Sequence, residues 1–154
     1  MAKSNIHWPA VLPPGLQSGR EYRRESPNKR SKMTTGRQLQ RRAKPGAPWY
    51  ARVTWLMDNG EAQAFMAWAR DILGDCNYWF NFPMKTPLGY NLHSVRIVNH
   101  YSGPSIAGPN LWSFSAEVEF DEGPLAPLGD GEFPGDLVYT ELFDITMNRN
   151  WPKP

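Results

Sequence analysis

Strict alternation of apolar and polar side chains runs through Trp112-Ser-Phe-Ser-Ala-Glu-Val-Glu-Phe120. Successive side chains of a β-strand point to opposite faces, so this pattern gives one apolar face and one polar face. Such alternation is typical of a strand in an antiparallel sheet that has one face on the core and the other in solvent. We therefore expect a β-strand over residues 112–120, paired with antiparallel neighbours.

Upstream, a strand leads directly into a helix. The segment Tyr50-Ala-Arg-Val-Thr-Trp-Leu-Met57 is rich in residues that favour strands. Asp58 and Glu61 follow with the spacing of a capping box, which marks the first turn of a helix. Gly74 suits the left-handed position that ends a helix. Between these signals the apolar residues recur at helical spacing: Ala62, Phe65, Met66, Ala69, Ile72 and Leu73.

The rest of the chain predicts two shorter strands and several connecting segments. Tyr78-Trp-Phe-Asn-Phe82 indicates an aromatic strand that ends at Pro83, and residues 93–98 indicate a further strand. Residues 84–91 and 101–110 contain proline and glycine and predict loops. After Asp121 the chain is rich in proline and glycine. It has one short apolar piece, residues 137–143, which fits either a strand or a helical turn.

Together these elements predict an α+β fold: a small antiparallel β-sheet or sandwich with one packed α-helix. We expect this core at residues 48–122, between a basic, extended arm at 1–47 and a Pro/Gly-rich arm at 123–154. The 154 residues suffice for one compact domain. They contain no apolar run of the roughly 18 residues that a membrane-spanning helix needs. A single cysteine, Cys76, excludes an internal disulfide and a multi-cysteine metal site.

Charge divides unevenly along the chain. Residues 1–45 carry +9 and residues 46–154 carry −7, which together give the net charge of +2. The basic stretch from Gln17 to Pro45 has few sizeable apolar residues, so alone it is expected to remain disordered. A basic arm can contact either an acidic protein surface or nucleic-acid phosphates. We favour protein, because few aromatic residues for base stacking accompany the bases and no nucleic-acid-binding motif follows.

Catalytic signatures are not evident in the sequence. It has no phosphate-binding loop, no nucleophile elbow and no HExxH spacing, and His7, His93 and His100 are interpreted as surface residues. Cys76 is interpreted as a small packed residue. Glu117 and Glu119 could pair as carboxylates, but polar alternation on a solvent-facing strand explains them equally well. We therefore expect neither an enzyme nor a cofactor.

The order strand, helix, aromatic strand and closing strand resembles the minor tail proteins of tailed bacteriophages. That family includes the lambda-type minor tail protein and related distal-tail ring proteins. The resemblance covers residues 49–122. It is carried by Asp58-Asn-Gly-Glu61, Leu73-Gly74, Trp79-Phe-Asn-Phe82-Pro83 and the strand 112–120. It implies a virion structural protein in an oligomeric ring, commonly sixfold, that contacts other phage tail proteins. It implies assembly in the host cytoplasm, with no catalysis, cofactor or membrane.

Both arms depart from that family, because the N-terminal arm is longer and more basic and a long C-terminal arm follows. The alternatives are therefore a head–tail junction adaptor, an adaptor outside any virus, and a nucleic-acid-binding protein with a basic arm. In the favoured hypothesis the arms link neighbouring copies, and removal of residues 1–45 should abolish ring formation. Large aromatic residues and arginines dominate protein contacts. The candidate subunit-interface residues are Trp8, Arg20, Arg23, Arg24, Arg30, Arg37, Arg41, Arg42, Trp49, Trp68, Tyr90, Tyr101 and Trp151, and the candidate acidic partners are Asp121, Glu122, Asp130, Glu132, Asp136 and Glu141.

Overall fold

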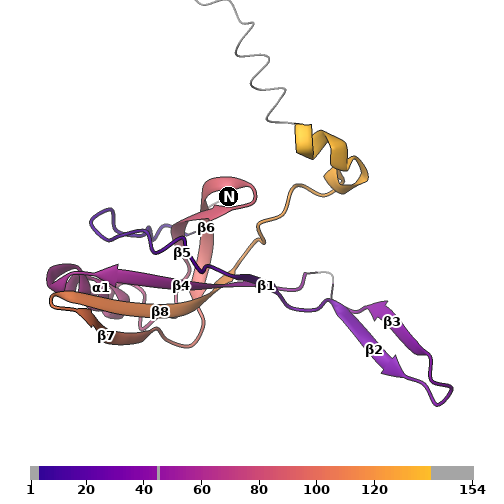
Figure 1. Cartoon of the computed structure of the whole chain (residues 1–154), viewed down its shortest axis with the longest axis horizontal. Helices are drawn as coiled ribbons and strands as arrows, with labels where there is room; N and C mark the ends of the chain where they lie inside the picture. Colours follow the sequence, from indigo (N-terminus) through magenta and orange to yellow (C-terminus); the bar gives the residue numbers. More distant parts are fainter. Residues whose placement is uncertain (1–3, 45, 140–154) are drawn as a thin grey trace, which may run out of the picture. The chain divides into compact units, whose positions relative to one another are not determined.

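The computed structural model describes residues 4–44 and 46–139 (Figure 1). The described chain divides after Pro124 into two units. The first unit holds eight strands and one α-helix, and the described part of the second holds a short 3₁₀ helix and the start of a further helix at residue 134. In chain order they are β1 (Tyr22–Arg24), β2 (Asn28–Lys32), β3 (Gln38–Arg42), β4 (Trp49–Met57), α1 (Asn59–Asp71), β5 (Phe80–Thr86), β6 (Gly89–Ile97), β7 (Ser102–Gly108), β8 (Leu111–Phe120) and η1 (Asp130–Glu132).

Strands β4 and β8 form the centre of a six-stranded sheet in the order β1-β4-β8-β6-β5, with β7 also paired to β8. They run antiparallel in an unbroken register from Trp49 opposite Phe120 to Met57 opposite Trp112. The inner residues of β8, such as Phe114 and Val118, are fully buried. The predicted strand at 112–120 and the predicted α+β class, an antiparallel sheet with one packed helix, are confirmed.

Helix α1 begins as the capping box predicts. The Glu61 backbone N–H donates to the Asp58 carboxylate at 2.8 Å, and the Asp58 N–H donates to the Glu61 carboxylate at 3.0 Å. Most of the predicted apolar stripe faces the core, including Leu73, which is fully buried just beyond the end of the helix, but Ile72 is 49% exposed. Gly74 has φ of +55°, the left-handed conformation predicted for the residue that ends the helix. No helix in the described part of the chain is long and apolar enough to cross a membrane.

Two predicted loops are wrong, because the structure forms strands there. β5 continues through Pro83 to Thr86 and pairs with β6 in a hairpin, so most of the predicted loop at 84–91 is strand. β7 occupies most of the predicted loop at 101–110 and pairs irregularly with β8. Proline cannot donate to a sheet ladder, but an edge strand with register shifts tolerates it. The prolines therefore led the sequence to predict loops in both places where the chain continues as a strand.

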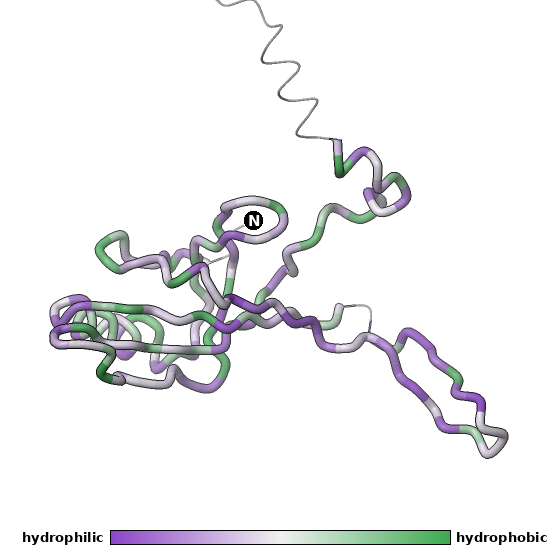
Figure 2. The backbone as a smooth tube through the Cα atoms, in the orientation of Figure 1, coloured by the Kyte–Doolittle hydropathy of each residue, from purple (hydrophilic) through white to green (hydrophobic). Residues whose placement is uncertain are grey.

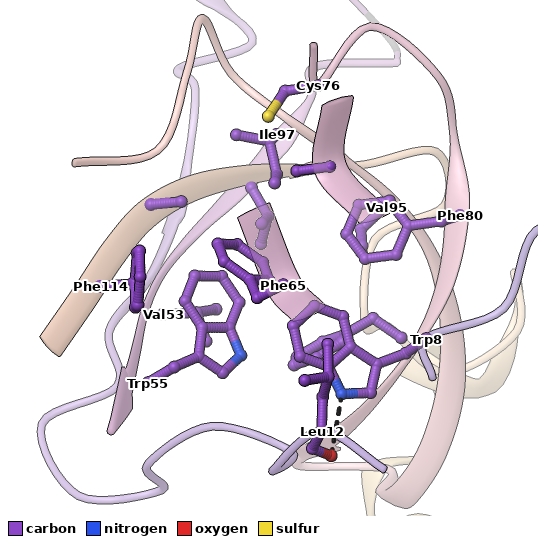
Figure 3. Close-up of a cluster of buried hydrophobic side chains, with 14 of the residues drawn as sticks. Trp8, Leu12, Val53, Trp55, Phe65, Cys76, Phe80, Val95, Ile97 and Phe114 are labelled. Atoms are coloured by element: carbon purple, nitrogen blue, oxygen red, sulfur yellow. Dashed lines mark hydrogen bonds between the residues drawn. The ribbon is translucent and has the colours of Figure 1, made fainter. Parts of the chain in front are cut away.

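The core extends beyond residues 48–122, because residues from the predicted N-terminal arm complete it. Trp8 and Leu12 are 8% and 4% exposed, and the Trp8 indole N–H donates to the Leu12 carbonyl at 3.3 Å (Figure 3). The Trp8 ring stacks on Trp55 at 5.5 Å and meets Phe82 edge-on at 4.8 Å. Such aromatic pairs add stabilisation beyond the area that they bury.

Backbone hydrogen bonds hold this N-terminal segment on the edge of β5. The Trp8 N–H donates to the Asn81 carbonyl at 2.9 Å, and the Asn81 N–H donates to the Ile6 carbonyl at 2.8 Å. The buried Asn81 side chain also donates to the Ser4 carbonyl at 2.6 Å. At the opposite edge of the sheet β1 pairs with β4. The described residues 4–24 therefore contribute Trp8 and Leu12 to the core and attach to both edges of the main sheet.

Candidate subunit-contact surfaces

Strands β2 and β3 form a two-stranded ribbon, residues 28–42, that is separate from the main sheet (Figure 1). They pair antiparallel over five residues each, from Asn28 opposite Arg42 to Lys32 opposite Gln38. All residues of both strands are exposed, and Figure 2 shows them as largely hydrophilic. The sequence predicted disorder here. The structure instead satisfies the backbone by cross-strand hydrogen bonds, with no buried side chain in either strand.

The two faces of the ribbon differ in chemistry. On one face Arg30 lies opposite Gln40 and donates to its side chain at 2.9 Å, and two further bases, Lys32 and Arg42, share this face. On the other face Lys29 lies opposite Arg41, next to Leu39, which is 56% exposed. Like charges directly opposite each other destabilise a strand pair. We call this second face the basic-apolar face, defined by Lys29, Ser31, Leu39 and Arg41.

The described C-terminal segment, residues 125–139, contains no buried residue. It includes η1 and a helix that begins at residue 134, so residues 137–139 are helical and the rest of the predicted apolar piece lies outside the described residues. Figure 2 shows hydrophobic and hydrophilic residues mixed along it. Its exposed large apolar side chains are Leu125, Leu128, Phe133, Leu137, Val138 and Tyr139.

Two ion pairs link strands of the main sheet on its solvent-facing side. Arg23 of β1 pairs with Glu117 at 3.0 Å, and Arg96 of β6 pairs with Glu119 at 2.8 Å. The Arg96 guanidinium also lies over the Trp79 ring at 4.8 Å. Glu117 and Glu119 therefore serve as partners for neighbouring arginines. Beside them lies an open, polar hollow of about 350 Å³.

The predicted arginines separate into two sets. Arg23 and Arg24 lie on β1, at the edge of the main sheet, and Arg20 lies just before it. Arg20 donates to the Leu16 carbonyl at 3.1 Å, and Arg24 lies over the Trp49 ring at 5.7 Å. The other set lies on the ribbon or its turn, and all its members are exposed: Arg30, Arg37, Arg41 and Arg42. Only this second set is placed on a surface with no role in the core.

The predicted aromatic anchors also separate. Trp8 is buried, which corrects its assignment as a contact residue, because its ring fills the core between Trp55 and Phe82. Three others are partly buried against the core, namely Trp49, Trp68 and Tyr101. Tyr90 alone among the described anchors is strongly exposed, at 56%. Trp151 lies outside the described residues.

Tyr90 was predicted as a contact residue, but the strand that carries both it and Leu92 was missed, because residues 84–91 were predicted to be a loop. Tyr90 and Leu92 alternate on β6 and are both more than half exposed, and Leu88 stands at the adjacent turn. Alternation at positions 90 and 92 was a usable signal for a strand with an apolar outer face. This patch is a further candidate contact surface.

The histidines and the cysteine do not converge. His93 packs edge-on against Phe120 at 5.6 Å, and burial lowers the pKa of its imidazole. His100 is exposed and lies on the Tyr101 ring at 4.2 Å. Cys76 is a free, buried thiol beside Ile97, and burial raises its pKa (Figure 3). Among the described residues no cluster of His, Cys, Asp or Glu could hold a metal ion.

Compared with known proteins, the chain matches no protein-family model, no curated protein and no solved structure.

Proposed function

We propose that this chain is a structural, non-catalytic subunit of an oligomeric ring in the tail of a bacteriophage. The observation that carries the proposal is the ribbon, in which every residue of β2 and β3 is exposed while the core closes without it. An isolated two-stranded hairpin is at best marginally stable in water. A ribbon without a core role is therefore best explained as a surface for a partner.

The phage-tail assignment rests on the resemblance over residues 49–122. The order of that resemblance, a strand into a capped helix, an aromatic strand and a closing strand, corresponds to β4, α1, β5 and β8. The closing strand β8 pairs with β4 from Trp112 to Phe120, so these elements make one folded unit. In this proposal the subunit binds copies of itself and other tail proteins, and it needs no cofactor.

The experiment that tests the proposal is imaging of the purified full chain by negative-stain electron microscopy, with its mass measured by light scattering. A closed ring of discrete mass, sixfold if the resemblance holds, is the expected result. A monomer at every accessible concentration would contradict a self-assembling ring.

Deletion of residues 1–45 is not a fair test of the arms, because it removes Trp8 and Leu12 from the core. The sharper variant replaces residues 28–42 with a short Gly-Ser turn. The ends of that segment are already held near each other, since the Ala43 N–H donates to the Pro27 carbonyl at 2.8 Å. This variant removes the ribbon and leaves every core residue in place.

A second candidate function is nucleic-acid binding through the same ribbon. Residues 26–44 contain seven Lys or Arg and no acid, and a two-stranded β-ribbon fits the major groove of DNA. This function predicts that the logarithm of DNA affinity falls steeply and linearly with the logarithm of salt concentration. Weak binding with a shallow salt dependence would leave the ring proposal as the better explanation.

A further inference from the structure

We propose that the basic-apolar face of the ribbon in one copy binds the C-terminal segment, residues 125–139, of a second copy. This inference rests on the proposed function and deepens it by naming the two surfaces that meet. A surface that binds a different surface on the next copy makes a head-to-tail contact, and such contacts close into rings when the rotation between copies allows it.

Charge complementarity between the two segments is the first argument. Residues 28–42 hold six bases and no acid, whereas residues 125–139 hold three acids and no Lys or Arg. Lys29 and Arg41 lie directly opposite each other on the basic-apolar face. An acidic partner would offset their mutual repulsion, which acts in the ribbon alone. Asp130 and Glu132 lie within the described C-terminal segment and carry charge of the required sign.

The second argument is that both surfaces are partly apolar and lack cover. Leu39 projects from the basic-apolar face at 56% exposure, and Met33, at the adjacent turn, is 49% exposed. Leu128 is fully exposed and Phe133 is 66% exposed in the C-terminal segment. Burial of such side chains against each other would supply the non-directional part of the contact. The flanking charges would fix its register and select the partner.

The two segments also resemble each other in composition and exposure. Each combines large exposed apolar side chains with charges of a single sign, and neither contributes a buried residue to its own unit. A nucleic-acid partner would satisfy the bases of the ribbon but would leave Leu39 and the C-terminal apolar side chains unexplained. A second copy explains both segments with one contact.

The test exchanges the charges of the two surfaces in the full-length chain. One variant carries Lys29→Glu and Arg41→Glu, and the other carries Asp130→Lys and Glu132→Lys. Each alone should raise the concentration for half-assembly by at least about tenfold, because like charges would then face each other. An equimolar mixture should restore the oligomer mass of the unaltered chain, since the altered, acidic face of the ribbon in one variant would meet the basic segment of the other.

In the mixture the two variants must alternate around the ring, and such a ring can close only with an even number of subunits. Recovery of a closed ring would therefore show that the number of subunits is even. Circular dichroism and thermal unfolding should match those of the unaltered chain, because none of the four positions is buried.

The outcomes separate this inference from the proposed function. If both variants assemble as the unaltered chain does, a ring exists but these surfaces do not form it, and the inference fails alone. If neither variant assembles and their mixture stays monomeric, contact between two copies through these surfaces is overturned.

If the unaltered chain is itself monomeric, both proposals fail. DNA binding that is lost only in the ribbon variant would then assign the ribbon to nucleic acid.

Discussion

The N-terminal segment that contains Trp8 and the ribbon are about twenty residues apart in the chain, yet they contribute to the molecule in opposite ways. Trp8 is covered by the rings of Trp55, Trp68 and Phe82, and its backbone is bonded to β5. The strands of the ribbon bury no side chain, and neither of them pairs with a strand of the main sheet. We therefore expect stability to depend on the segment that contains Trp8 and assembly to depend on the ribbon, although both lie in the basic N-terminal region.

The largest expected effect on stability comes from truncating a buried aromatic residue, Trp8. Truncation of an exposed aromatic residue, Phe133, serves as the control. Trp8→Ala should lower the free energy of unfolding by about 3–5 kcal/mol, because it leaves a cavity among large rings. Phe133→Ala, at a 66% exposed position of the C-terminal segment, should change it by less than about 0.5 kcal/mol. Urea denaturation at a dilution where the chain is monomeric measures both. Equal losses from the two variants would remove the distinction between core and exposed segment.

A smaller effect is expected at the start of α1. Asp58→Ala removes the capping bond to the Glu61 N–H and should cost about 1 kcal/mol of unfolding free energy. Asp130→Ala is the matched control, because η1 has no capping bond from a side chain. It should leave the stability of the main unit unchanged in the same urea titration. A cost at Asp130 as large as that at Asp58 would contradict the account.

The smallest effect concerns pH. Burial against Phe120 lowers the pKa of His93, so the folded state favours the neutral imidazole while the unfolded chain takes up a proton near pH 6.5. The contribution of His93 should be fully present above that pH and should be lost as the pH falls below it. The stability advantage of the unaltered chain over His93→Asn, measured from pH 8 to pH 5, should therefore shrink. An advantage that grows on acidification would reverse the assigned sign.

Local chemistry made part of the fold predictable. The alternation at 112–120 and the capping box at Asp58 depend only on neighbours in the chain, and both elements formed where the sequence placed them. Trp8 and Leu12 show no periodicity and lie beside Pro9 and Pro13, so nothing local marked them as core. Their burial depends on β5, about seventy residues away, and such long-range contacts leave no pattern in a short window.

The candidate contact surfaces were predictable in charge but not in form. The bases of residues 26–44 are plain in the sequence, but strands made of Lys, Arg, Gln and Asn contradict ordinary strand composition. The division of the arginines between the main sheet and the ribbon depends on where β1 ends and β2 begins. That boundary depends on the pairing of β1 with β4, which a single sequence does not encode locally.

The separation of stability from assembly is tested most directly by replacing residues 28–42 with a short Gly-Ser turn. Light scattering would give the mass of this variant and of the full chain, and urea denaturation would give their stability at dilution. The account predicts a discrete oligomer for the full chain and a monomer for the variant. Their unfolding free energies should agree within about 0.5 kcal/mol, because the ribbon buries no side chain. A variant that still forms the oligomer, or one that no longer folds, would contradict the account.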